Sequence, residues 1–316
     1  ARAVLESAVR ETTGVEVVSL HGRPGASLRR HLVRGRTLVV LTDAENSPAW
    51  IAAQVVAAGL GQTQCWVCEA LGHARERVRK FPVAELAAIR EPFDPLNVVV
   101  LKLRGEGGLP DFPGVADDWF NTGTDGSRMI TKREVRLAIL SLLQPGAGEQ
   151  FWDIGAGCGS VAVELARWRT DINVVAVEQQ PGRVSSIREN RDRFGVVANL
   201  RIVEGRAPAV LAGLPPPDKI FIGGSDGAMD ALLRSCWQHL PAGGILVASA
   251  VTEGARQQLF SFSSVLERQG AARFDAVQIA LSRAAPLGAQ WVFRPQLPVT
   301  LFQLIKPPQS NSPEAS

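Results

Sequence analysis

The stretch that decides the fold is "FWDIGAGCGS", residues 151–160. Its apolar run ends in Asp153, and three glycines follow at alternate positions before a small-residue segment begins at Ser160. Glycine lets the backbone adopt positive φ and approach a ligand closely. A helix beginning at Ser160 would offer unpaired N–H groups to that ligand. The stretch therefore predicts a strand, a ligand-binding turn and a helix.

Three classes of ligand suit such a turn, and the spacing separates them. A nucleoside-triphosphate loop needs a Lys after its last glycine, and none follows Gly159. A dinucleotide fingerprint needs a glycine where Ser160 stands. The pattern D/E-x-G-x-G-x-G is matched from Asp153 to Gly159, and it resembles the S-adenosylmethionine (SAM) loop of class I methyltransferases. We expect SAM as the cofactor; the alternative is a purely structural turn beside a surface Glu.

An acid for the ribose of SAM follows on the next strand. Glu178 ends "NVVAVE" about 20 residues after Gly155, the separation expected of a ribose-binding acid. The strand after that ends "IVEGRAP", and adenine is expected against its last residues. The predicted cofactor-binding residues are Asp153, Gly155, Ala156, Gly157, Cys158, Gly159, Glu178, Gly205, Arg206, Ala207 and Gly223.

The first third of the chain, residues 1–104, reads as alternating α/β material. Helices are expected at 1–13, 47–61 and 82–89, and strands at 15–22, 37–43, 63–72 and 95–103. Near-continuous apolar strands are typical of a parallel sheet. The Gly- and Pro-rich residues 105–127 keep no apolar period and are predicted to be a linker.

A second α/β series occupies residues 128–308. It opens with an amphipathic helix at 131–145, in which Thr131 and Glu134 have the spacing of a capping box. Further helices are expected at 160–168, 181–194, 206–213, 227–240 and 252–269, and strands at 149–154, 173–178, 200–204, 219–223, 245–250, 274–282 and 299–306. The last two strands lack an intervening helix, which predicts a final hairpin on a Rossmann-like, seven-stranded α/β sheet. The polar tail at 309–316 is expected to be disordered.

Composition bounds the class of protein. The 316 residues carry a net charge of +3, too small to indicate nucleic-acid binding. No run approaches the roughly 18 apolar residues of a membrane span, and no signal segment opens the chain, so a cytoplasmic protein without a membrane partner is expected. Cys65 and Cys68 have no second pair for zinc, which predicts buried thiols and no metal. The chain opens without Met, and an incomplete N-terminus is expected.

Several motifs extend the resemblance to a narrower family. "ITKREVR", "WDIGAGCGSVAVELAR", "FIGGSDG" and "LSRAAPLG" together resemble the C15-methylating, decarboxylating precorrin methyltransferases. The earlier "VSLHGR", "LTDAENSPAWIA" and "CEALGHARERV" resemble the C5-methylating tetrapyrrole methylases. The resemblance implies a fusion in which residues 128–308 form a class I, SAM-dependent C15 methyltransferase. Residues 1–104 would be the second lobe of the C5 methylase, with its first lobe missing, so C5 methylation is expected of the full-length protein.

The resemblance also implies a substrate and a set of binding residues. The substrate would be a precorrin, a macrocycle rich in acetate and propionate groups, and Thr131 would reach the cofactor. Arginine forks pair well with carboxylates, although each charge could equally be a solvated surface group. The predicted substrate-binding residues are Arg128, Lys132, Arg136, Gly224, Arg283 and Arg294. No catalytic residue is assigned; Ser225 and Asp226 are the candidates.

Other functions fit parts of the same pattern. A class I methyltransferase acting on another small molecule or on RNA is one alternative. An N-terminal half that serves only as a scaffold is another. Relatives of the C15 domain assemble as tetramers, so a homo-oligomer formed through the C-terminal domain is expected.

Overall fold

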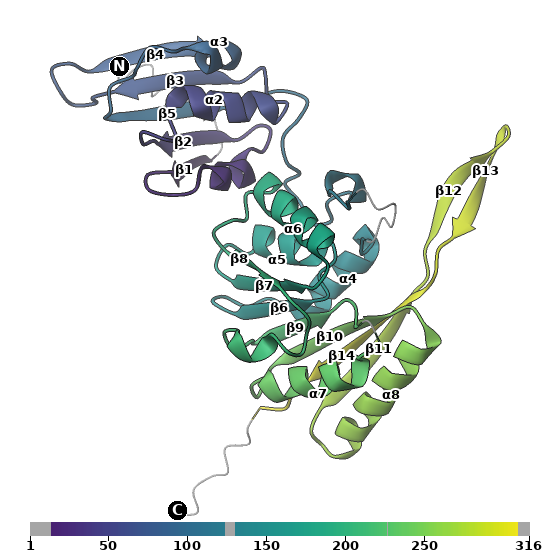
Figure 1. Cartoon of the computed structure of the whole chain (residues 1–316). Coiled ribbons are helices and arrows are strands. Elements are labelled where there is room, and N and C mark those ends of the chain that lie inside the picture. The colour runs from purple at the N-terminus through teal and green to yellow at the C-terminus, as the bar shows by residue number, and fades with distance from the viewer. Residues whose placement is uncertain (1–13, 124–129, 226, 309–316) are drawn as a thin grey trace, which may run out of the picture. The chain divides into compact units, whose positions relative to one another are not determined.

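The computed structural model describes residues 14–123, 130–225 and 227–308. The chain divides into two compact units (Figure 1). The N-terminal unit comprises Ala1–Phe112 with Asp192–Ala198, and the C-terminal unit comprises Pro113–Arg191 with Asn199–Ser316. None of the described helices is long and apolar enough to cross a membrane.

The N-terminal unit is built on a five-stranded sheet of order β1-β2-β5-β3-β4. Its strands are β1 (Val15–Ser19), β2 (Thr37–Leu41), β3 (Gln64–Glu69), β4 (Arg77–Pro82) and β5 (Asn97–Lys102). Its helices are η1 (Gly25–His31), α2 (Pro48–Ala57) and α3 (Val83–Ala88). Buried residues of α2 and α3 pack with one face of the sheet in a single core. The helix predicted at 1–13 lies outside the described residues.

The prediction of a parallel sheet is wrong for this unit. Among the strands of its described residues, β1 and β2 are the one parallel pair, and β5 pairs antiparallel with both β2 and β3. Val67 and Val99 pack in the core with the helices, whereas Trp66 and Val100 form a second cluster. Continuous apolar strands thus report burial on both faces and not strand direction. The charged strand β4 and the helix η1 were not predicted.

The thiols of this unit lie where the sequence placed them. Cys65 and Cys68 are free and buried, as predicted. Burial raises the pKa of Cys65 to about 12 and that of Cys68 to about 11. Neither thiol is therefore a thiolate at neutral pH, which fits a packing role.

The C-terminal unit contains a seven-stranded sheet of order β11-β14-β10-β9-β6-β7-β8. The strands are β6 (Gln150–Ile154), β7 (Asn173–Glu178), β8 (Leu200–Glu204), β9 (Lys219–Ile222), β10 (Ile245–Ala250), β11 (Arg273–Ile279) and β14 (Val299–Ile305). The first five run parallel, and β14 is antiparallel to β10 and β11. The predicted seven-stranded sheet with a final antiparallel pair is therefore confirmed.

The strand order reverses beside β6. The chain steps outward from β6 to β7 and β8, then returns to place β9 on the other side of β6. Such a reversal opens a crevice at the carboxyl ends of the parallel strands, where open α/β sheets bind ligands. The predicted glycine turn follows β6 directly, so it lies at this crevice.

Five α-helices accompany the seven-stranded sheet (Figure 1). They are α4 (Arg133–Leu143), α5 (Ser160–Trp168), α6 (Pro181–Arg193), α7 (Met229–His239) and α8 (Glu253–Arg268). The helix predicted at 206–213 is wrong, because only a short 3-10 turn, η3 (Leu211–Gly213), forms there. Pro208 lacks the N–H that a helix interior needs. The predicted Thr131 cap is also wrong: α4 begins at Arg133, and its N-cap, Lys132, makes no side-chain capping bond.

Two features between the predicted elements were missed. A second hairpin, β12 (Ser282–Leu287) and β13 (Gln290–Pro295), is inserted between β11 and β14 and projects from the sheet (Figure 1). The predicted linker is not an open segment over its described part, because Leu109, Val115 and Phe120 are buried. A short 3-10 helix, η2 (Asp117–Trp119), also forms in this segment.

Candidate active site

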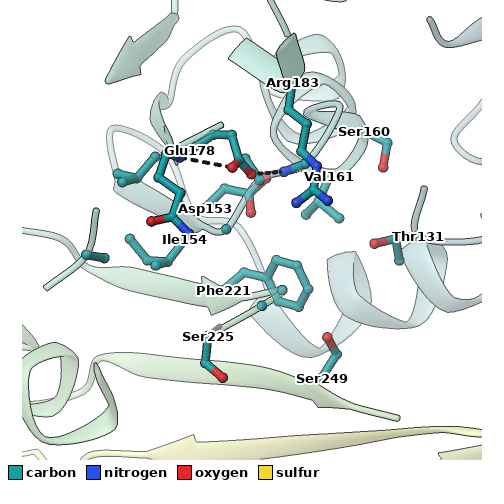
Figure 2. A pocket seen from close by; sticks show the side chains of 18 of the residues that line it. Thr131, Asp153, Ile154, Ser160, Val161, Glu178, Arg183, Phe221, Ser225 and Ser249 are labelled. Atoms are coloured by element: carbon teal, nitrogen blue, oxygen red, sulfur yellow. Dashed lines mark hydrogen bonds between the residues drawn. The ribbon is translucent and has the colours of Figure 1, made fainter. Parts of the chain in front are cut away.

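A cavity of about 380 Å³ lies at the crevice beside β6. Its wall combines the glycine turn after β6, the ends of β7, β9 and β10, and the residues that precede α4. Figure 2 shows Asp153 and Glu178 on one side of this space and Ser225 and Ser249 across from them. The cavity therefore draws together segments from across the whole C-terminal unit.

The glycine turn is shaped by close backbone approaches. Gly155 has φ +69°, and a Cβ there would lie 2.7 Å from the carbonyl oxygen of Gly224. Gly159 has φ +79° and serves as the N-cap of α5, where a Cβ would meet Ile187 at 2.9 Å. Side chains at these two positions would be both strained and obstructed. The turn can keep this course only with glycine at both places.

Glu178 is held at the end of β7 by main-chain donors. The side chain is 4% exposed and lines the cavity. Its Oε2 accepts from the Gly157 N–H at 2.9 Å, and its Oε1 accepts from the N–H groups of Gln179 and Gln180, each at 2.9 Å (Figure 2). A carboxylate oxygen has more than one acceptor position. Glu178 is thus a fixed acceptor with capacity left for a ligand hydroxyl.

Asp153 is the second acid of the cavity, and it is only partly satisfied. It is 1% exposed, and its Oδ2 accepts from the Ala162 N–H at 3.0 Å. Within the described part of the chain, its Oδ1 has no hydrogen-bond partner. Burial raises the pKa of Asp153 to about 7, and the nearby charge of Glu178 contributes. Buried acceptors are rarely left unpaired, so this oxygen favours a ligand that carries an N–H donor.

Most of the predicted cofactor residues line the cavity together. They are Thr131, Asp153, Gly155, Ala156, Gly157, Glu178, Gly205, Arg206, Ala207 and Gly223. Cys158 and Gly159 do not line it, which corrects their assignment as contact residues. Cys158 is buried and its carbonyl accepts from Asn190 at 2.9 Å, while Gly159 packs toward Ile187. Both residues belong to the part of the turn that faces α6, where Asn190 and Ile187 lie.

Arg136 is the clearest correction among the predicted substrate residues. Its side chain is fully buried and lies outside the cavity wall. Nε donates to Glu164 at 2.8 Å, and Nη1 donates to Asp117 at 2.9 Å and to the carbonyl of Thr131 at 2.5 Å. A buried guanidinium whose donors already bond to these groups cannot bind a substrate carboxylate. It instead fixes the main chain of Thr131, which does line the cavity.

The other predicted substrate residues divide between wall and surroundings. Lys132 and Gly224 line the cavity, as does the candidate Ser225. Arg283 and Arg294 do not line it; they face each other across the β12–β13 hairpin, and Arg283 pairs with Glu134 at 2.5 Å. Their sequence position could not reveal that they belong to a projecting hairpin. The remaining two predicted residues, Arg128 and Asp226, lie outside the described residues.

Several residues of the wall were not anticipated. They are Ile130, Val135, Ile154, Ser160, Val161, Val177, Gln179, Arg183, Phe221, Leu232, Ser249, Val251 and Val299. Ser160 and Val161 open the helix after the glycine turn and could have been found by extending that motif. Ser249 and Val251 flank the end of β10, and the rule that ligands bind at the carboxyl ends of strands points to them. Arg183 lies in the first turn of α6, after the strand that ends at Glu178, and no motif identified it.

The strand order, the glycine turn after the central strand and the acid on its neighbour together define a class I methyltransferase. Comparison with known proteins narrows this class. A family model described as the precorrin methyltransferase domain matches residues 118–306. The chain belongs to the precorrin methyltransferase family.

Named relatives agree with that family. A Sinorhizobium protein named precorrin-6Y C(5,15)-methyltransferase (decarboxylating) is 38% identical over 92% of this chain and 68% of its own length. A Salmonella typhimurium protein named cobalt-precorrin-6B C(15)-methyltransferase (decarboxylating) is 38% identical over 54% of this chain and 85% of its own. The crystal structure of a precorrin-6Y C5,15-methyltransferase from Geobacter metallireducens superposes with a TM-score of 0.56 at 32% identity, over 63% of this chain and all of that one.

Proposed function

We propose that the C-terminal unit transfers a methyl group from SAM to C15 of a precorrin macrocycle and removes carbon dioxide from the ring C acetate, as a step of cobalamin biosynthesis. The observation that carries this proposal is the hydrogen bond from the Gly157 N–H to Glu178, which joins the glycine turn to the ribose-binding acid inside one cavity. The names of the two curated relatives support the substrate and the position of methylation.

The cavity fits SAM by the chemistry of its donors and acceptors. Glu178 would accept hydrogen bonds from the ribose hydroxyls, and the unpaired Oδ1 of Asp153 would accept one from the ammonium group. The wall at Gly205, Arg206 and Ala207 would border the adenine. When bound, SAM supplies an electrophilic methyl group on its sulfonium.

The residues around the methyl position would act by placing the substrate. Gly223, Gly224 and Ser225 form a small-walled stretch of the cavity after β9, which leaves room for a bulky macrocycle. Lys132, whose ammonium is 3.8 Å from Asp117, offers a cation on the same wall. A reduced tetrapyrrole meso carbon is already enamine-like, so holding it in line supplies much of the rate. No His is among the described residues that line the cavity, so no imidazole base is assigned.

Loss of carbon dioxide requires no further acid or base from the chain in this account. The bond between the acetate methylene and its carboxylate breaks, the macrocycle takes up the electron pair, and a proton is later added from solvent. A carboxylate held away from the cations of the wall would lose carbon dioxide most readily, because charge pairing stabilises the anion. The other carboxylates of the macrocycle would stay bound to those cations.

We propose that residues 1–104 are the second lobe of a C5-methylating tetrapyrrole methylase. A scaffold role for this half is the second candidate.

We also propose that the protein forms a homo-oligomer through its C-terminal unit. Three large apolar residues of the β12–β13 hairpin, Leu287, Trp291 and Phe293, are 58%, 74% and 76% exposed. Exposed apolar groups of this size mark interaction surfaces. Light scattering of the wild type and of Trp291→Ser would test it. A cytoplasmic location stays a prediction.

Mass spectrometry of the tetrapyrrole after incubation with the protein and SAM tests the proposed function. The expected product has gained one methyl group and lost one carbon dioxide. Two added methyl groups would assign C5 methylation to this chain as well. An unchanged macrocycle, with methyl transfer to RNA or to another small molecule, would contradict the proposal.

A further inference from the structure

Arg183 is a cation of the cavity wall with no role so far. It lies in the first turn of α6, the helix that follows the strand ending at Glu178, and it is half-buried. Figure 2 shows it reaching from its helix toward Val161, past the acids of the glycine turn. The guanidinium is therefore directed into the space that the proposed ligands would share.

Among the residues that the structure describes, no side chain forms a hydrogen bond or an ion pair with this guanidinium. The main-chain N–H of Arg183 donates to the carbonyl of Gln180 at 3.0 Å, so only the side chain is without a partner. The nearest acid in sequence, Glu178, already accepts from three main-chain N–H groups. Arg188, farther along the same helix, does have a partner, Glu204 at 3.5 Å. A partly buried charge is costly to leave unpaired, so the position next to Arg183 suits an anion from outside the chain.

The helix itself gains nothing from a cation at this position. The first turn of α6 contains no acidic residue, and Arg183 lies at its positive end. A cation at a helix N-terminus opposes the helix dipole and lowers stability slightly. The helix dipole therefore gives no reason for a cation at this position, whereas ligand binding does.

We propose that Arg183 binds a carboxylate group of a ligand in this cavity. The inference rests on the proposed function, in which two ligands carry such a group: the amino-acid end of SAM and the acetate and propionate arms of the macrocycle. Arginine presents a planar fork that matches a carboxylate with two parallel hydrogen bonds. Lysine provides the charge without that fork.

The test compares Arg183→Gln and Arg183→Lys with the matched control Arg188→Gln. Calorimetry with S-adenosylhomocysteine, which keeps the carboxylate, is paired with calorimetry using decarboxylated SAM, which lacks it. Steady-state kinetics give KM for the macrocycle. R183Q should lower the affinity for one of the two carboxylate ligands about tenfold or more, which is the scale of a charge-assisted hydrogen bond. R183K should lose less, and R188Q should match the wild type within about twofold.

The pattern of losses identifies the source of the carboxylate. Weaker S-adenosylhomocysteine binding with unchanged binding of decarboxylated SAM assigns Arg183 to the cofactor. Unchanged cofactor affinity with an increased macrocycle KM assigns it to the substrate. In both cases the Tm of R183Q should equal or exceed that of the wild type, because the unfavourable dipole interaction is gone.

Two results would overturn the inference while leaving the proposed function in place. One is a cofactor affinity and a macrocycle KM for R183Q that both stay within about twofold of R188Q. The other is an equal loss of affinity for the cofactors with and without the carboxylate, which indicates general damage to the site. A wild-type protein that binds no S-adenosylhomocysteine would instead contradict the proposed function, and this inference with it.

Discussion

Each unit has an aspartate near the carboxyl end of a strand, and the surroundings of the two aspartates are opposite. Asp43 follows β2 and accepts from the N–H groups of Gly22, Glu45 and Asn46, so it closes a surface turn. Asp153 belongs to β6, accepts from the Ala162 N–H alone, and keeps a buried oxygen unpaired. The main-chain bonds, that from Asn46 foremost, lower the pKa of Asp43, whereas burial raises the pKa of Asp153 to about 7.

The difference follows from the two sheets. In the N-terminal unit β5 runs antiparallel to β2, so the loop after β2 meets the start of β5, where Thr42 bonds to Asn97. In the C-terminal unit the carboxyl ends of β6, β7 and β9 lie at one edge on both sides of a reversal. Parallel neighbours therefore leave polar groups around a cavity, while antiparallel neighbours allow the loops to satisfy one another. An acid with an unpaired buried oxygen, such as Asp153, therefore indicates a binding site better than an acid such as Asp43, whose oxygens are paired within the chain.

The largest expected effect concerns stability and compares a buried ion pair with an exposed one. Arg136→Met should lower the free energy of unfolding of the C-terminal unit by about 3–5 kcal/mol, because the buried Glu164 would lose its cationic partner. Arg36→Met, in the N-terminal unit, breaks pairs whose side chains are 37% to 55% exposed and should cost less than about 1 kcal/mol. Urea unfolding measures both changes. Equal losses would contradict the account of Arg136 as a structural arginine.

The next effect concerns ligand affinity and compares two glutamates on neighbouring strands, one that lines the cavity and one that does not. Glu178→Ala should weaken S-adenosylhomocysteine binding about a hundredfold, because the ribose loses its acceptor and the Gly157 N–H loses its partner. Its register partner on β8, Glu204, is the control: it pairs with Arg188 at the surface, and Glu204→Ala should leave affinity within about twofold. Calorimetry reports both values. Full affinity in the Glu178 variant would remove the ribose assignment.

The third effect, the smallest at each step because it is spread over several pH units, uses pH to separate the two aspartates. An acid whose pKa is raised on folding binds more protons when folded, so stability falls as pH rises from its unfolded pKa, near 4, toward 7. Asp153→Asn should abolish this fall, which is at most about 1.4 kcal/mol per pH unit. Asp43 has a lowered pKa, so its contribution is present at neutral pH and is lost on acidification.

Thermal unfolding of the ligand-free protein at a series of pH values checks this contrast. Asp153→Asn should gain stability relative to the wild type as pH approaches 7, and Asp43→Asn should lose stability at neutral pH. Parallel pH profiles for the two variants would show that their surroundings do not differ as described.

The local sequence pattern predicted the buried strands and helices of the C-terminal unit better than its exposed hairpin. The helix at 160–168 and the strands at 200–204 and 245–250 occur at the predicted bounds, because the glycine turn and the apolar runs mark their ends. The β12–β13 hairpin was missed because its exposed residues have no burial pattern. Strand direction in the N-terminal unit was wrong, since apolar composition does not encode it.

The prediction of the site was limited in the same way, because sequence motifs report local structure and not contacts between distant segments. Motifs located the glycine turn and Glu178, whose roles depend on residues close in sequence. The burial of Arg136 depends on Glu164 in another helix, and a surface arginine and a buried one look alike in a sequence. Arg183 was missed for the converse reason: only the structure shows which helical face borders the cavity.

The most direct test of the account is a crystal structure of the protein with S-adenosylhomocysteine. The account predicts the ligand in the cavity beside β6, with its ribose hydroxyls on the Glu178 carboxylate and its amino group on Asp153 Oδ1. A ligand bound elsewhere in the C-terminal unit, or a cavity that stays empty at saturating ligand, would contradict it.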